Sequence, residues 1–264
     1  MLQFVGYHAI RLRQRNRGNT ITVDHEGMET QPRQRAEQER IEDVYRSWHG
    51  GAALARYAWH RPEILQQVAA RSRGFADLLS YTVGADLSGV QVLDVGCGTG
   101  GFLRQLIDWG ATPANLTGTE LQKDRLDHAR RCTANGVRWH LGTLDAMPPA
   151  GYDLVTAQTV FSSVLDPALR RELAAQMWRA LRPGGWCLVF DFRYDNPRNP
   201  NVRKVTRAEL QRWWPGGGQR YRSLVLAPPI HRLLAGAPSM VTELLTALAP
   251  ALRSHFMYVV RKSD

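Results

Sequence analysis

The stretch "QVLDVGCGTGGF", residues 91–102, decides the fold of this chain. An apolar run from Val92 to Val95 contains one acid, Asp94, and four glycines follow within six residues. A short apolar run that stops at glycine predicts a buried strand. Glycines after a strand let the backbone turn tightly and come close to a ligand. The stretch therefore predicts a strand, a ligand-binding loop and a helix that begins near Gly101.

Length and composition indicate one globular domain. The chain has 264 residues, of which 44% are hydrophobic and 22% charged, as is typical of a soluble protein. No apolar run approaches the ~20 residues that cross a bilayer, so we expect no membrane span. Three cysteines without metal-ligand spacing favour reduced thiols, no metal site and a cytoplasmic protein. The net charge of +10 comes from scattered arginines, which favours a solvated surface over a nucleic-acid footprint.

Strands and helices alternate through the middle of the chain. Apolar strands are predicted in "GVQVLDVG", "NLTGTE", "VRWHLG", "YDLVTAQ" and "WCLVFDF", with helices at 101–109, 123–134 and 167–181 between them. Alternation at this pitch predicts an α/β fold, with a doubly wound, mostly parallel sheet.

The carboxyl-terminal part departs from this alternation. Thr206 and Glu209 predict a capping box before a short helix. Two further strands, "QRYRSLVLA" and "SHFMYVVRK", bring the sheet to seven. Residues 227–253 lie between them and are too long for a hairpin turn, so we expect a helical insertion that binds the acceptor.

The amino-terminal part divides into a basic extension and two helices. Residues 1–31 contain no acid before Asp24 and are predicted to be a disordered extension. Helices are predicted over 32–49, where Pro32 suits a helix start, and over 62–80. The domain limits that follow are 1–31, 32–87 and 88–264.

The glycine pattern alone leaves two ligands open. Gly96, Gly98 and Gly101 satisfy G-x-G-x-x-G, the pattern of dinucleotide-binding loops, whose pyrophosphate rests on the helix N-terminus. S-adenosylmethionine is the other ligand. It carries a cationic sulfonium and no phosphate, and its amino acid end requires a nearby carboxylate, which Asp94 supplies.

Four stretches in order resemble the class I S-adenosylmethionine-dependent methyltransferases. "LDVGCGTG" is similar to motif I, an acid-x-G-x-G-x-G pattern, and "LRPGG" at 181–185 is similar to the turn before the fifth strand. Glu120 ends the second strand, and Asp145 follows the third. The resemblance covers about residues 88–192, and it implies a Rossmann-like fold and S-adenosylmethionine as the cofactor.

The resemblance also implies a set of cofactor-binding residues. Glu120 would bind both ribose hydroxyls, Asp145 would lie near the adenine amino group, and Cys97 would line the cofactor by its backbone. Gln158 would lie near the methionine part. The complete set is Asp94, Gly96, Cys97, Gly98, Gly100, Glu120, Leu121, Asp145, Ala146 and Gln158.

The acceptor site is predicted beyond the fourth and fifth strands, beneath a lid formed by residues 32–87. His60, Asp191 and Tyr194 are the candidate catalytic residues. His60 is the candidate base because the pKa of histidine lies near neutrality. Candidate substrate-binding residues are Tyr57, Arg193 and His231. For each of them the alternative is a purely structural role.

The function predicted is methyl transfer to a hydroxyl or amine of a small molecule, with oxygen ahead of nitrogen. The Asn/Asp-Pro-Pro-aromatic motif of amino-group nucleic acid methyltransferases is missing from the sequence, and the apolar insertion suits a small molecule. We expect neither a nucleic acid nor a membrane as partner, and we make no prediction of oligomeric state. The alternatives are an RNA or protein methyltransferase, an NAD-dependent oxidoreductase and a binding module without activity.

Overall fold

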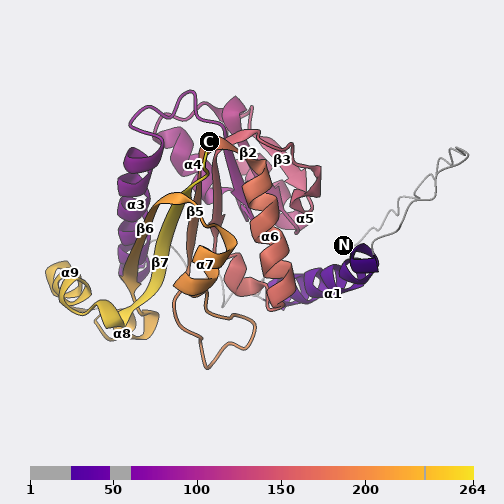
Figure 1. Cartoon of the computed structure of the whole chain (residues 1–264). Coiled ribbons are helices and arrows are strands. Elements are labelled where there is room, and N and C mark those ends of the chain that lie inside the picture. Colours follow the sequence, from indigo (N-terminus) through magenta and orange to yellow (C-terminus); the bar gives the residue numbers. More distant parts are fainter. Residues whose placement is uncertain (1–24, 48–60, 235) are drawn as a thin grey trace, which may run out of the picture.

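One seven-stranded sheet forms the centre of the molecule (Figure 1). The computed structural model describes residues 25–47, 61–234 and 236–264. The strand order is β3-β2-β1-β4-β5-β7-β6; β7 pairs antiparallel with both neighbours, and the other pairs are parallel. The strands are β1 Val92–Val95, β2 Leu116–Glu120, β3 Arg138–Leu141, β4 Tyr152–Gln158, β5 Leu181–Phe192, β6 Gly217–Leu226 and β7 Arg253–Arg261. This confirms the predicted doubly wound, mostly parallel, seven-stranded sheet.

Helices cover both faces of the sheet, and the strand residues alternate between them. Val92 and Leu154 pack on one face, against α3 Pro62–Thr82, α4 Gly101–Asp108 and α5 Lys123–Cys132. Their neighbours Leu93 and Val155 pack on the other, against α6 Pro167–Ala180 and α7 Arg207–Trp213. Strands buried on both faces read as nearly continuous apolar runs, which is why the sequence predicted them well.

The register of the central strands brings their carboxyl ends together. Val95 at the end of β1 pairs with Thr119 of β2 on one side and with Ala157 of β4 on the other. Glu120 and Gln158 follow these partners, so they end their strands beside the glycine loop that follows β1. Ligands of open α/β sheets bind at this edge.

The first helix is longer than predicted. The structure has α1 at His25–Ser47, so residues 25–31 are helical and differ from the predicted disorder. Pro32 therefore lies inside the helix and not at its start. A proline removes one backbone donor and disfavours the helical conformation of the residue before it, which is why the sequence favoured a helix start at this point. Residues 1–24, like 48–60, lie outside the described residues, and their disorder stays a prediction.

The insertion between the last two strands is helical, as predicted. It contains α8 Pro228–Leu233, α9 Ser239–Leu248 and the 3-10 helix η4 Pro250–Leu252. The amide of Ala227 donates to the carbonyl of Leu252 at 2.9 Å, which closes the base of the insertion. The predicted capping box is also confirmed, because Thr206 and Glu209 exchange hydrogen bonds at the start of α7.

The described residues contain neither a candidate membrane span nor a candidate metal cluster. None of the helices in these ranges combines the length and the apolar character that crossing a bilayer requires. The same ranges hold no cluster of three or more His, Cys, Asp or Glu side chains arranged for a metal ion.

Candidate functional site

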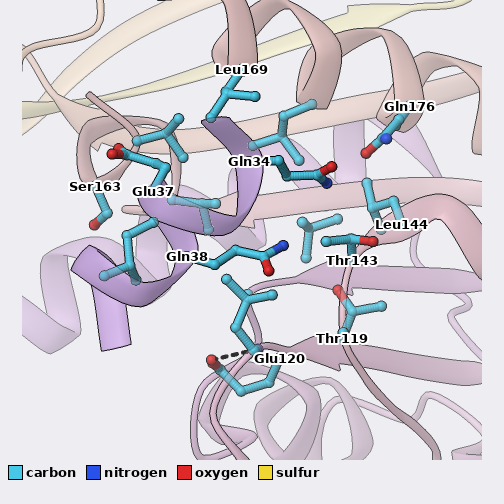
Figure 2. A pocket seen from close by; sticks show the side chains of 18 of the residues that line it. Gln34, Glu37, Gln38, Thr119, Glu120, Thr143, Leu144, Ser163, Leu169 and Gln176 are labelled. Carbon is cyan, nitrogen blue, oxygen red and sulfur yellow. Dashed lines mark hydrogen bonds between the residues drawn. The ribbon is translucent and has the colours of Figure 1, made fainter. Parts of the chain in front are cut away.

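A cleft of about 990 Å3, partly open to solvent, lies at the carboxyl edge of the sheet (Figure 2). The ends of β1, β2 and β4 form its floor, and α1 and α6 form its walls. Of the predicted cofactor residues, those that line it are Gly96, Glu120, Leu121 and Gln158. The structure thus brings together predicted residues from three strand ends.

The glycine loop leaves room that no side chain could share. Gly96, Gly98 and Gly100 have φ angles of +63°, +58° and +76°, a conformation that other residues rarely adopt. A Cβ atom on Gly96 would lie 2.7 Å from Val160 Cγ2, across the cleft. Gly100 is the N-cap of α4, and it does not line the described cleft. The loop therefore brings bare backbone to the floor of the cleft.

The carboxylate of Glu120 is fixed by backbone amides. Its Oε2 atom accepts from Gly98 N at 2.9 Å, and its Oε1 atom accepts from Leu121 N at 2.9 Å and from Gln122 N at 3.0 Å. A carboxylate offers about four acceptor positions, so one remains for a ligand hydroxyl. Glu120 thus presents an oriented acceptor at the wall of the cleft.

Asp94 lies behind the glycine loop, on the sheet face that α3 covers. It is 2% exposed and accepts a hydrogen bond from Thr156 Oγ1 at 2.6 Å. Burial raises the pKa of Asp94 to about 7; the Thr156 hydrogen bond opposes this, and the Glu120 charge adds to it. Asp94 is not among the residues that line the described cleft.

The positive charge of Arg71 in α3 lowers the pKa of Asp94 and so favours its ionised form. The site predicted from the sequence did not include Arg71. Its Nε atom is buried and donates no hydrogen bond within the described residues. Burial lowers the pKa of Arg71, and Asp94 opposes that shift. A guanidinium with a buried, unmet donor favours an anionic ligand. The signal in the sequence was the spacing, because Arg71 stands four residues before the buried Phe75.

His255 of β7 is a second residue that the sequence analysis missed. It is 7% exposed, and its ring stacks on Phe190 with centroids 4.9 Å apart. Burial and, to a smaller extent, the Arg71 charge lower the pKa of His255 to about 3. The imidazole is therefore neutral at physiological pH. No sequence motif flags a histidine of this kind.

Cys97 faces the interior. Its amide donates to Thr119 O at 2.9 Å, and burial raises the pKa of its thiol well above the usual value. A thiol of that kind is a poor nucleophile. The side chain does not line the described cleft, and a role for the Cys97 backbone stays a prediction.

Asp145 and Ala146 lie at the rim and are exposed. Asp145 accepts hydrogen bonds from Thr143 Oγ1 at 2.7 Å and from Gln176 Nε2 at 2.8 Å. Thr143 and Gln176 line the described cleft, whereas Asp145 and Ala146 do not. Asp145 thus contacts two residues of the cleft wall but does not line the cleft itself, and its predicted role near the adenine stays a prediction.

Asp191, a predicted catalytic residue, is a support for the loop after β4. It is fully buried and accepts from Ser162 N at 3.1 Å and Phe192 N at 2.8 Å. Burial raises the pKa of Asp191 to about 6, although these hydrogen bonds oppose the shift. Two backbone amides hold its carboxylate, and the residue does not line the described cleft.

The other predicted acceptor residues lie at the insertion or outside the described residues. Tyr194 Oη donates to Ala251 O at 3.2 Å, and Arg193 Nη1 donates to Pro250 O and Arg253 O, both at 2.9 Å. These contacts hold the base of the insertion, because β5 ends beside η4. His231 is buried on α8, and Tyr57 and His60 lie outside the described residues.

Thr159 marks a strained point at the end of β4. Its φ angle is +54°, and a β-branched residue there is under strain of roughly 1–3 kcal/mol. Three hydrogen bonds hold it, from Thr159 N to Phe190 O, from its hydroxyl to Gln158 O, and from Ser163 Oγ to Thr159 O. Thr159 lines the cleft, and strain of this kind concentrates at functional sites.

Comparison with known proteins identifies the family. Residues 92–185 match the family described as "Methyltransferase domain". This stretch is a methyltransferase domain, and the chain is an S-adenosylmethionine-dependent methyltransferase. The prediction of a methyltransferase is thereby confirmed, and it replaces the alternative of an NAD-dependent oxidoreductase.

Curated relatives of this methyltransferase are 26% to 32% identical to it over the aligned residues. The ubiquinone biosynthesis O-methyltransferase of Thiobacillus denitrificans is 28% identical over 170 residues, which cover 62% of this chain and 70% of that protein. The protein of the same name from Bordetella pertussis is 32% identical over 53% of this chain and 57% of its own length. The sterol 24-C-methyltransferase of Yarrowia lipolytica is 28% identical over 61% of this chain and 43% of its own length. The match thus spans less than two thirds of the last two.

Solved structures share the fold of this methyltransferase. An S-adenosylmethionine-dependent methyltransferase from Mesorhizobium loti has a TM-score of 0.50 and 18% identity over 67% of this chain and 93% of that one. Geranyl diphosphate C-methyltransferase from Streptomyces coelicolor, in complex with S-adenosyl-L-homocysteine, has a TM-score of 0.53 and 14% identity over 72% and 79%. Identities this low establish the fold alone.

The cofactor of the family, S-adenosylmethionine, fits the residues present. The Gly96 position would be filled by any Cβ atom, and Glu120 keeps an acceptor position free beside it. Asp94 and Arg71 do not line the described cleft, but they interact with each other behind its floor and carry the two charges that complement an amino acid group.

Proposed function

We propose that this methyltransferase methylates a hydroxyl or amine of a small molecule, with a hydroxyl as the first candidate. The observation that carries the proposal is Glu120, which is held by three backbone amides beside a bare glycine loop at the edge of the sheet. Relatives named ubiquinone biosynthesis O-methyltransferases support oxygen as the acceptor atom.

Each part of the cofactor has a proposed partner in the chain. Glu120 would accept a hydrogen bond from one ribose hydroxyl at its remaining acceptor position, and Gly96 and Gln158 would face the methionine part. Asp94 would attract the ammonium group, and Arg71 would donate to the carboxylate. Asp145 remains proposed for the adenine end, acting through Thr143 and Gln176, which it holds.

The chain contributes binding and orientation to the reaction. S-adenosylmethionine, when bound, supplies an activated methyl group for in-line displacement. Holding the acceptor and the methyl group in line can lower the activation barrier by ~7–11 kcal/mol. A hydroxyl acceptor must also lose a proton, for which His60 remains the proposed base. Asp191 is not proposed as the base, because it is fully buried and does not line the described cleft.

The test is calorimetric titration of the protein with S-adenosylhomocysteine, with NADH in parallel. We expect micromolar binding of S-adenosylhomocysteine alone. Release of S-adenosylhomocysteine from S-adenosylmethionine is then measured with matched panels of phenols and primary amines. Turnover of phenols supports the proposal, turnover of amines alone moves the acceptor to nitrogen, and turnover only with RNA or protein contradicts it.

A further inference from the structure

Two charged side chains of α1 reach across to the loop between β4 and α6. Glu37 Oε1 accepts a hydrogen bond from Leu165 N at 2.5 Å, and a guanidinium nitrogen of Arg40 donates to Ser163 O. Glu37 and Arg40 also pair with each other at 2.8 Å and 2.9 Å. We name these two residues with their two loop partners the clasp.

The ion pair of the clasp, Glu37 with Arg40, is more buried than the Arg35–Glu39 pair of the same helix. The Glu37 and Arg40 side chains are 13% and 26% exposed, whereas Arg35 and Glu39 are 82% and 64% exposed. Although burial favours protonation, hydrogen bonds from Arg40 and Leu165 lower the pKa of Glu37, so its carboxylate is charged at neutral pH. A charged hydrogen bond shielded from water holds two elements together more firmly than an exposed pair.

The clasp lies at the wall of the cofactor cleft. Gln34, Glu37, Gln38 and Ile41 follow the spacing of one helix face, and all four line the cleft together with Ser163. Figure 2 shows Gln34 and Gln38 extending from α1 toward the wall that carries Thr143, with Glu120 below. The helix face that the clasp holds down is therefore the face that closes the cleft.

We propose that the clasp controls exchange of the cofactor, by holding α1 over the bound nucleoside and releasing it for departure. The proposal rests on the proposed function, which places the cofactor in this cleft. Gln34 and Gln38 hydrogen-bond the nucleoside while the hydrogen bonds of Glu37 and Arg40 to the loop are formed. Glu37 and Arg40 are positioning residues, because they act through α1.

The first test compares Glu37→Gln with Glu39→Gln, a matched change on the outer face of the same helix. Glutamine keeps an acceptor for Leu165 N but loses the charge. We expect stopped-flow displacement to show S-adenosylhomocysteine leaving the Glu37 variant about 10-fold faster, as the loss of a charged hydrogen bond predicts. We expect an unchanged rate for the Glu39 variant. Arg40→Gln is the second variant, should Glu37→Gln not fold.

The second test separates the clasp from simple helix stability. In the double variant Glu37→Arg with Arg40→Glu, the ion pair within α1 is kept. The exchanged side chains can neither accept from Leu165 N nor donate to Ser163 O. We expect fast dissociation, and faster hydrogen exchange at the Leu165 amide, in both this variant and Glu37→Gln. A wild-type rate in the double variant would mean that the pair only stabilises the helix, and would overturn the proposal.

The outcomes keep the two proposals apart. If the wild-type protein does not bind S-adenosylhomocysteine, the placement of the cofactor fails and the clasp fails with it. If the wild-type protein binds but Glu37→Gln and Glu39→Gln release the ligand at equal rates, the clasp alone is overturned. A 10-fold difference between these two folded variants supports it.

Discussion

Asp94 is a carboxyl group whose burial favours the neutral form, while an ammonium ligand favours the ion. Burial raises its pKa to about 7 in the folded chain, from an ordinary value of 3.8. The native state then binds more protons than the unfolded state between these values. This group's contribution to stability is therefore present at acid pH and is lost as the pH rises toward 7.

Asp94→Asn should make the free protein more stable at pH 8 than the wild type. Asparagine still accepts from Thr156 Oγ1 but carries no charge. We expect the gain at pH 8 to exceed the gain at pH 5 by ~2 kcal/mol, measured by urea denaturation. Affinity for S-adenosylhomocysteine at pH 8 should fall at least ~10-fold.

Asp108→Asn, at the exposed end of α4, is the control and should show neither effect. A gain from Asp94→Asn that is equal at both pH values would contradict the burial argument. Unchanged affinity in the same variant would remove Asp94 from the cofactor site.

Gly96→Ala should disturb folding and binding together. The new methyl group would require a φ of +63° and would lie 2.7 Å from Val160 Cγ2. We expect a loss of roughly 1–3 kcal/mol of stability and weaker binding of S-adenosylhomocysteine. Gly89→Ala is the control, because a methyl group at Gly89 would meet no atom within 4 Å and the φ there is ordinary. Equal losses in the two variants would mean that the close approach at Gly96 is unimportant.

Single residues were predictable where a strand end fixed their place. Glu120 and Gln158 follow apolar runs, and parallel register puts such residues at one edge. The contacts of Asp191 and Tyr194 could not be predicted in this way, because their partners Ser162 and Ala251 lie in short 3-10 helices whose positions the sequence does not show. Arg71 was hidden because an arginine on a helix is usually solvated.

At the scale of elements, Arg170 joins α6 to two loops. Its side chain is fully buried and donates to Val164 O at 2.6 Å, Lys204 O at 3.1 Å and Arg203 O at 3.0 Å. Arg170→Gln should lower the free energy of unfolding by about 3–5 kcal/mol, because these carbonyls and Glu209 lose a buried cation. Urea denaturation measures the loss. Arg171→Gln, on the exposed side of the same helix, should change stability by less than ~0.5 kcal/mol, and a similar loss there would contradict this.

Strands were more predictable than helix limits. All seven runs proposed as strands are strands. The signal is strongest where burial on two faces leaves a continuous apolar run, as in β1 and β4, and weaker in β3, whose residues are exposed or half-buried. β5 is longer than predicted, because its pairing with β4 begins at Leu181, before a register shift. α1 extends to His25 because an exposed polar helix carries little periodicity to mark its start.

At the scale of the whole molecule, cofactor binding should stabilise the fold. The cleft joins β1, β2 and β4 to α1 and α6, so a ligand there links elements that lie far apart in the described chain. S-adenosylhomocysteine at 100 times its dissociation constant should add about 2.7 kcal/mol, seen as a rise of roughly 5–10 °C in Tm. NADH at the same concentration should leave Tm unchanged. A rise with NADH alone would contradict the cofactor assignment.

The insertion that leaves β6 and returns at β7 has its two ends tied. Leu226 pairs with Arg253, and the amide of Ala227 bonds to the carbonyl of Leu252, so the chain departs and re-enters at one point. The rest of the sheet keeps its register whatever the length of the excursion. Residues 228–251 can thus be lengthened or shortened without disturbing the strands that form the floor of the cleft.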